Sequence, residues 1–232
     1  MILTSLIDWL FPRCCYLCGQ GPTYLCDRCQ AKIKPLETGY CPVCNRPSPQ
    51  GLTHPRCRRR WQPDGLLALF PYQPPLSSLL KELKYQRYFE LAPDLARLAG
   101  RVLTSHPIFS YWSRRQFYFL AIPLFPQRQE WRGFNQSQLI LDHLGQQLSL
   151  PILRDCLIRV KWTRAQAQLS ARERRANLRQ SFRLNSGVSV QGLNLVIFDD
   201  VWTTGATLRA AIRVLKQKGA AEVWGLTLFG RF

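Results

Sequence analysis

The stretch that decides the fold is Leu193-Asn-Leu-Val-Ile-Phe-Asp199-Asp200-Val-Trp-Thr203-Thr204-Gly205-Ala-Thr207. Its apolar half predicts a buried strand that ends in two adjacent carboxylates, and the hydroxyl- and glycine-bearing turn that follows leads into a helix. The backbone N–H groups of such a turn converge where the helix N-terminus adds positive potential, so the expected ligand is a phosphate monoester. Neighbouring carboxylates accept hydrogen bonds from a vicinal diol. The stretch therefore predicts a site for a ribose 5-phosphate.

Strand and helix patterns alternate on both sides of this stretch. Apolar runs predict strands over 66–72, 117–122 and 223–229, and helical periodicity predicts helices over 76–85, 91–104, 135–148 and 206–217. This alternation predicts βαβ units, and hence an α/β fold with a mostly parallel sheet and flanking helices. Such sheets bind their ligands beyond the carboxyl ends of the strands, which is where the acidic pair is predicted to lie.

Composition indicates a folded protein with room for one α/β core and a small added module, since the 232 residues are 46% hydrophobic and 12% aromatic. The 32 Lys and Arg residues against 14 Asp and Glu leave a net charge of +18. That charge indicates a polyanionic partner: nucleic acid, a phosphorylated metabolite or an anionic membrane surface. No apolar run approaches the roughly 20 residues of a transmembrane helix. Residues 1–11 lack the features of a signal peptide, so we expect a cytoplasmic protein.

The chain is predicted to divide into three parts. Apolar residues at helical spacing predict a short amphipathic helix in residues 1–12, which Pro12 ends. Residues 13–63 are rich in Cys, Pro and Gly and have little periodicity, so a metal is expected to hold them together. Residues 64–232 contain the alternating strands and helices.

Pairs of metal-ligand residues with two residues between them recur in the second part, as an internal repeat. Thiolate and imidazole ligands favour Zn²⁺, and four protein ligands close a site, so the zinc is expected to be structural. Two ions are expected, on the sets Cys15, Cys18, Cys26, Cys29 and Cys41, Cys44, His54, Cys57. The alternatives are a single ion and a crossed pairing of the first two cysteines of each set.

The acidic pair and the turn after it, Asp-Asp-x-x-Thr-Thr-Gly-x-Thr, resemble the phosphoribosyl pyrophosphate (PRPP) motif of the type I phosphoribosyltransferases. By this resemblance Asp199 and Asp200 would hold the ribose 2′- and 3′-hydroxyls. The 5-phosphate would lie on Thr203, Thr204, Gly205, Ala206 and Thr207. The resemblance also implies a small hood over an open, mostly parallel sheet, and Mg²⁺ bound together with PRPP.

Further stretches resemble the ComF/GntX group of competence-associated, phosphoribosyltransferase-like proteins. They are Ile122–Arg128, Trp131–Gln136 and Gln166–Leu178, and the group also has an N-terminal zinc module. The resemblance covers nearly the whole chain. It implies a role in DNA uptake and natural transformation, with other competence proteins as candidate partners.

The same resemblance assigns two further regions of the site. Pyrophosphate would lie near Arg128 and Arg132, and residues 166–175 would form the hood. The chain departs from the group's pattern at Phe125, at Trp202, and at His54 and Arg60 near the last ligand pair. The first two departures concern transfer chemistry more than PRPP binding.

Three functions stay open at this point: an active phosphoribosyltransferase (a glycosyltransferase) acting on a nitrogenous base or amine, a single-stranded DNA-binding factor, and a PRPP-sensing adaptor without catalysis. No residue stands out as a general base, so the catalytic residues are unassigned. The DNA hypothesis rests on Arg58, Arg59, Arg60 and Trp61, whose charges and ring suit phosphate contact and base stacking. Neutralising these arginines is expected to leave PRPP binding intact, because the PRPP residues lie far along the chain in another module.

Overall fold

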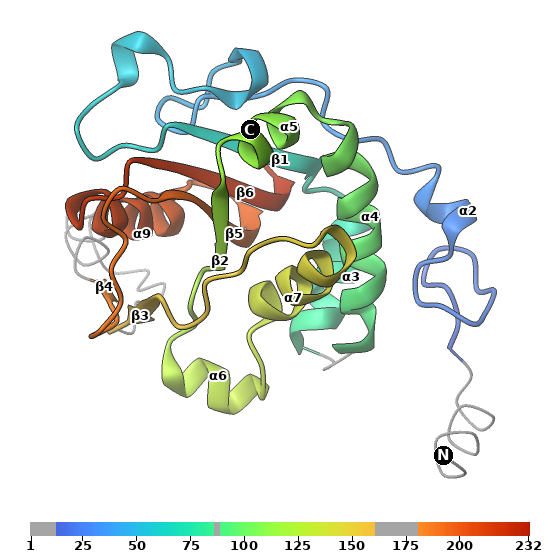
Figure 1. The fold of residues 1–232 in the computed structure, drawn as a ribbon. Helices are drawn as coiled ribbons and strands as arrows, with labels where there is room; N and C mark the ends of the chain where they lie inside the picture. The colour runs from blue at the N-terminus through green and yellow to red at the C-terminus, as the bar shows by residue number, and fades with distance from the viewer. Residues whose placement is uncertain (1–12, 86–88, 161–180) are drawn as a thin grey trace, which may run out of the picture.

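The structure is a computed structural model that describes residues 13–85, 89–160 and 181–232 (Figure 1). The helix predicted over 1–12 and the hood predicted over 166–175 lie outside the described residues. Within the described ranges, no helix is both long and apolar enough to cross a membrane.

The centre of the molecule is a four-stranded sheet in the order β1-β6-β5-β2. Its strands are β1 (Gly65–Pro71), β6 (Glu222–Gly230), β5 (Asn194–Trp202) and β2 (Phe117–Ala121). All three pairings are parallel. The predicted α/β fold with a mostly parallel sheet is therefore confirmed.

Helices cover both faces of this sheet (Figure 1). One face carries α3 (Leu76–Tyr85), α4 (Ala92–Ser105), α5 (Pro107–Arg114) and α7 (Gln136–Leu148), and the other carries α9 (Ala206–Gln217). Successive residues of β5 alternate between the two: Val196 and Phe198 pack with the first group of helices, whereas Leu195 and Ile197 pack with α9. A strand buried on both faces reads as a continuous apolar run, which explains the pattern in the sequence.

Shorter elements complete the fold. They are α2 (Asp27–Gln30), α6 (Pro126–Arg132), the antiparallel pair β3 (Leu157–Arg159) and β4 (Phe182–Leu184), and 3-10 helices at Pro49–Gly51, Pro55–Cys57 and Phe89–Leu91. Helix α5 was not among the predicted helices. It starts at Pro107 after the extended residue His106, whose ring Nδ1 accepts the Ile108 N–H at 3.2 Å.

The two halves of the Cys-rich segment lie on different parts of the core (Figure 1). In the first half, Leu25 is fully buried in the same apolar cluster as α4, and its N–H donates to Asp94 Oδ2 at 2.9 Å. The second half follows the edge of β1: the Leu36 N–H donates to the Leu69 carbonyl at 2.8 Å, and the Thr53 N–H donates to the Asp64 carbonyl at 2.9 Å. Hydrogen bonds from backbone N–H groups therefore join both halves to the α/β core, to a side chain in the first half and to carbonyls in the second.

Candidate functional site

The acidic pair lies at the carboxyl end of β5, just beyond the last residue of β2, since Ala121 pairs with Phe198. Asp200 is only 4% exposed. Its Oδ2 accepts hydrogen bonds from Lys84 Nζ of α3 and from Gln136 Nε2 of α7, both at 2.8 Å. Helices on one face of the sheet thus supply the cation and the amide that compensate for burying this carboxylate.

Asp199 is the less compensated member of the pair. Its Oδ1 accepts the Ser137 hydroxyl at 3.2 Å and the backbone N–H of Asp200 at 2.9 Å. Burial, helped by repulsion from the neighbouring Asp200, raises the pKa of Asp199 to about 7, although the positive charge of Lys84 opposes the shift. Hydrogen-bond donors that a ligand brings to such a carboxyl stabilise its ionised form.

The turn after the pair has the form that the sequence predicts. Thr203 and Thr204 are exposed, and Gly205 has a φ of 67°, the left-handed region. A side-chain carbon at Gly205 would lie 2.1 Å from the ring of Trp202, so only glycine fits there. Helix α9 begins at Ala206, whose N–H is 3.4 Å from the Thr204 hydroxyl.

The predicted arginines lie on α6, which follows β2. Arg132 is buried and donates to Gln136 Oε1, the other end of the amide that holds Asp200. Arg128 is exposed. Burial and repulsion from Arg128 lower the pKa of Arg159 on β3, while Asp199 opposes the shift. Arg132 therefore connects to Asp200 through Gln136, and Arg159 lies within electrostatic range of both Asp199 and Arg128.

Sequence reasoning missed four residues that the structure brings to this site: Lys84, Gln136, Ser137 and Arg159. Gln136 and Ser137 open α7 directly after its N-cap Asn135, which is a readable helix start. Lys84 and Arg159 lie in elements with no motif around them, so only the tertiary fold could have identified them.

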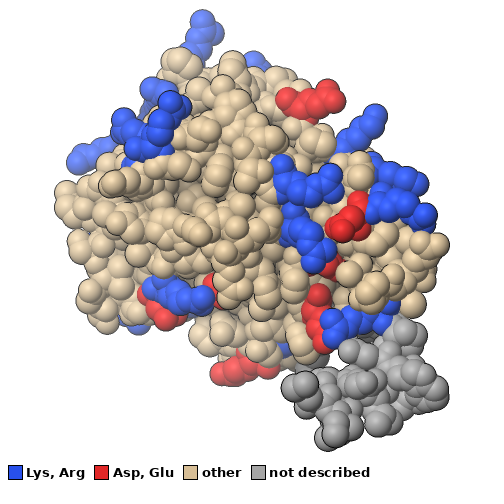
Figure 2. All heavy atoms as spheres, turned by 45° about the vertical axis from the view of Figure 1, so that its right-hand side comes forward, with Lys and Arg blue, Asp and Glu red and all other residues tan. Residues whose placement is uncertain are grey.

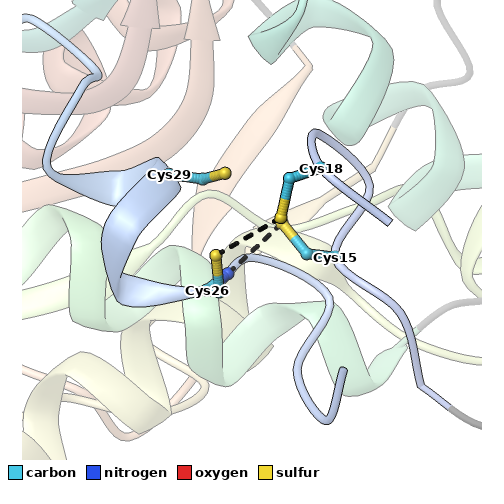
Figure 3. A group of neighbouring side chains, drawn as sticks. All are labelled: Cys15, Cys18, Cys26 and Cys29. Atoms are coloured by element: carbon cyan, nitrogen blue, oxygen red, sulfur yellow. Dashed lines mark hydrogen bonds between the residues drawn. The ribbon is translucent and has the colours of Figure 1, made fainter. Parts of the chain in front are cut away.

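The structure gathers the metal-ligand residues into two groups of four. Within each group the candidate ligand atoms all lie within 4.8 Å of one another: Cys15, Cys18, Cys26, Cys29 and Cys41, Cys44, His54, Cys57. In the first group the side chains converge from a loop and from the start of α2 (Figure 3). The pairing is the sequential one, and not the crossed alternative.

The chemistry of these groups fits a divalent cation. Burial acts to raise the pKa of Cys15, but backbone N–H groups, chiefly that of Cys26, outweigh it and lower this pKa to about 6. Burial and the neighbouring sulfurs raise the pKa of Cys29 to about 12. Four sulfurs this close cannot all be thiolates unless a cation neutralises them, and Zn²⁺ does so with tetrahedral geometry.

The second group also fits a zinc ion, with one imidazole in place of a thiolate. His54 Nδ1 lies 3.3 Å from Cys44 Sγ, whereas His54 Nε2 lies 3.0 Å from the Pro47 carbonyl. A carbonyl that accepts the N–H at Nε2 leaves Nδ1 free to ligate zinc. Among the remaining cysteines, Cys14 is exposed and Cys156 is buried.

The candidate nucleic-acid residues follow the last zinc ligand. Arg58, Arg59 and Arg60 are exposed, and the Arg60 guanidinium lies 5.4 Å from the centre of the Trp61 ring. On the face shown in Figure 2, Lys and Arg side chains form several separate groups, some with acidic side chains beside them. Positive charge on this face is therefore divided among patches.

Comparisons with known proteins match both parts of the chain. Residues 6–58 match the double zinc ribbon domain. The chain is 35% identical over 231 residues to DNA utilization protein YhgH of Salmonella typhi, covering 93% of this chain and 96% of that protein. It is 32% identical over 207 residues to competence protein F of Haemophilus influenzae, covering 87% and 89%.

One solved structure with some likeness is a hypoxanthine phosphoribosyltransferase from Staphylococcus aureus, with a TM-score of 0.38 and 14% identity over 60% of this chain and 63% of that one. The N-terminal segment is a zinc-binding module: the double zinc ribbon match and the two clusters of ligand atoms agree on it. Its zinc is structural, because each cluster supplies four protein ligands.

Proposed function

Because the chain belongs to the family of DNA utilization protein YhgH and competence protein F, we propose that it binds PRPP and serves DNA uptake and utilization in the cytoplasm. The proposed ligand site comprises Asp199, Asp200 and the turn 203–207. Other proteins of DNA uptake are the proposed macromolecular partners.

The observation that carries the proposal is the order of groups at the end of β5. Two carboxylates are followed, after Val201 and Trp202, by the exposed residues Thr203 and Thr204 and by Gly205 at the start of a 12-residue helix. Backbone N–H groups at a helix start bind phosphate, and carboxylates accept the hydroxyls of a diol. A ribose 5-phosphate carries a phosphate and a diol close enough together for the turn and the acidic pair to bind them at the same time.

Each residue of the site then has a distinct task. The turn holds the 5-phosphate, and Asp199 accepts a ribose hydroxyl that compensates for its burial. Lys84 and Gln136 hold the Asp200 carboxylate in its orientation. Arg128 offers its positive charge to the pyrophosphate. Mg²⁺ bound together with PRPP would supply further neutralisation of the phosphate charges.

Removal of both carboxylates tests the proposal. Asp199→Asn with Asp200→Asn keeps the volume of the side chains and removes the charged acceptors, so PRPP affinity should fall by about 1.5 to 3 kcal/mol for each hydrogen bond lost. Calorimetry with PRPP and Mg²⁺ measures this. Asp142→Asn is the matched control, because Asp142 lies further along α7 than Gln136 and Ser137 and pairs with Arg154. Unchanged affinity in a folded double variant would contradict the assignment.

Transfer to an acceptor is a separate question with its own assay. An active phosphoribosyltransferase releases pyrophosphate from PRPP when a nitrogenous base or an amine is supplied. Release that depends on both the acceptor and the acidic pair would make the protein an enzyme. PRPP binding without release, across purines, pyrimidines and amines, would make it a PRPP-sensing adaptor.

Single-stranded DNA binding is the second candidate function. It is supported by three consecutive exposed arginines beside Trp61, where the Arg60 guanidinium lies over the ring. Arginine and an aromatic ring side by side suit phosphate contact and base stacking without sequence preference. This function uses the second zinc ribbon and leaves the PRPP site available.

A further inference from the structure

One side chain joins the second zinc ribbon to the turn after the acidic pair. Arg209 lies in the first turns of α9, and its Nη1 donates to the Pro42 carbonyl at 2.8 Å. Its Nη2 donates to the Thr204 carbonyl. A single guanidinium therefore bridges the turn after the acidic pair to Pro42, which lies 167 residues before Arg209 in the chain.

The bridge is held in place on a third side. The Arg209 guanidinium lies over the Trp202 ring, 5.4 Å from its centre. The same ring closes the space beside Gly205, where a side-chain carbon would be 2.1 Å away. Trp202 is 1% exposed, so this platform is fixed by the core. Arg209, Trp202 and Gly205 together set the path of the turn.

The Pro42 end of the bridge belongs to a zinc ligand loop. Pro42 lies between the ligands Cys41 and Cys44, and the backbone N–H groups of Val43 and Cys44 bond to the Cys41 sulfur. The Pro42 carbonyl and the Val43 N–H belong to one planar peptide unit, so the bond from this N–H to the Cys41 sulfur also fixes the direction of the carbonyl. Because a bound zinc would fix both cysteines, it would also fix the acceptor for Arg209.

We infer that Arg209 is a positioning residue through which the second zinc ribbon holds the turn 203–207 in its phosphate-binding form. The inference rests on the proposed PRPP function and adds a dependence of that site on one zinc ion. A guanidinium suits the task, because its planar fork donates to two carbonyls while its face lies on an aromatic ring.

The first zinc ribbon offers the natural comparison, because its described polar contacts run to α4 and to Glu90 just before it. Leu25 donates to Asp94, and Asp27 lies 3.7 Å from Arg97. Both residues of α4 belong to the opposite face of the sheet from α9. Loss of zinc from the first site should therefore leave the turn 203–207 in place.

Variants of Arg209 test the bridge in the full-length protein. Arg209→Ala should weaken PRPP binding about tenfold, the size expected when a charge-assisted hydrogen bond that orders the site is lost. Arg209→Lys keeps the charge without the planar fork and should restore only part of the affinity. Arg213→Ala, one turn further along α9, is the control and should bind PRPP as the wild type does.

Zinc-ligand variants test the asymmetry between the two ribbons. Cys44→Ser and Cys18→Ser each replace the second cysteine of a knuckle, and metal analysis establishes which zinc is lost. Amide hydrogen exchange should become faster in 203–207 for Cys44→Ser and for Arg209→Ala, but not for Cys18→Ser. Thermal unfolding of each variant verifies that the α/β core is intact.

The outcomes separate this inference from the proposed function. If the wild type binds PRPP and all variants of Arg209 and Cys44 bind it equally well, the coupling is wrong. If the wild type does not bind PRPP, the proposed function fails, and the exchange rates alone decide the coupling. Equal protection of 203–207 in Cys44→Ser, Arg209→Ala and wild type overturns the coupling in either case.

Discussion

At the scale of single residues, the acidic pair is an asymmetric site. Asp200 has a lysine and an amide at 2.8 Å, whereas Asp199 has a hydroxyl at 3.2 Å and one backbone N–H. Burial and the neighbouring negative charge therefore raise the pKa of Asp199 from its ordinary 3.8 to about 7. A ligand that brings hydrogen-bond donors to Asp199 can therefore change the protonation of this carboxyl.

This shift predicts how PRPP affinity depends on pH. Ribose hydroxyls donate to the ionised carboxylate, and below pH 7 Asp199 holds a proton, so affinity should rise about tenfold between pH 6 and pH 8. Calorimetry at several pH values measures the change. Asp199→Asn should retain only the pH dependence that comes from the phosphates of PRPP.

The stability of the unliganded protein should change with pH in the opposite direction to PRPP affinity. The folded state holds the Asp199 proton more tightly than the unfolded state does, so this residue lowers the free energy of unfolding as pH rises from 3.8 toward about 7. An Asp199→Asn variant whose PRPP affinity changes with pH as much as that of the wild type would contradict the role given to this carboxyl.

At the scale of elements, the zinc ribbons are part of the packed core as well as metal sites. Cys15 and Cys29 belong to the same apolar cluster as α3 and α4, and Leu52 of the second ribbon forms a bridge with Gly65 of β1. The division into residues 13–63 and 64–232 stays a prediction, and hydrogen bonds cross it. The ribbons lack extended apolar periodicity of their own, so metal and core must stabilise them together.

The ligand sets predict the zinc content and the order of unfolding. The purified protein should contain two Zn²⁺ per chain, because each set of four ligand atoms is closed. A strong chelator should increase hydrogen exchange in residues 13–63 before it does so in the central sheet. Well under one zinc per chain, after growth in zinc-replete medium, would rule out the metal sites.

The sequence was informative where structure is local. The strand, acidic pair, turn and helix of 193–217 are consecutive, and the zinc ligands have their own spacing, so both could be predicted. Helix α5 was missed because its start depends on the single cap His106 and on Pro107. Lys84 and the Arg209–Pro42 bridge could not be predicted, because they depend on how distant elements pack.

At the scale of the whole molecule, the comparisons confirm the resemblance to the competence-associated family, because relatives at 35% and 32% identity cover most of the chain. One argument from the sequence is wrong in its reasoning. Distance along the chain does not separate the zinc module from the PRPP residues, since Arg209 contacts Pro42. Neutralising Arg58, Arg59 and Arg60 should still leave PRPP affinity intact. The reason is that Arg209 bonds to Pro42 and not to these arginines.

The net charge of +18 predicts how any single-stranded DNA is bound. Replacing Arg58, Arg59 and Arg60 by Gln should lower affinity almost equally across sequences and flatten the plot of log K against log salt by up to about three phosphate contacts. Salt titrations with single-stranded and duplex DNA measure this, and the single strand should bind more tightly. An unchanged salt slope would exclude this surface as the DNA site.

We propose that PRPP binds at the carboxyl end of β5, and a crystal structure of the full chain with PRPP and Mg²⁺ tests this most directly. We expect the 5-phosphate on the turn 203–207, the ribose hydroxyls on Asp199 and Asp200, and the pyrophosphate toward Arg128. PRPP bound elsewhere, or an acidic pair still contacted only by Lys84, Gln136 and Ser137 at saturating PRPP, would contradict it.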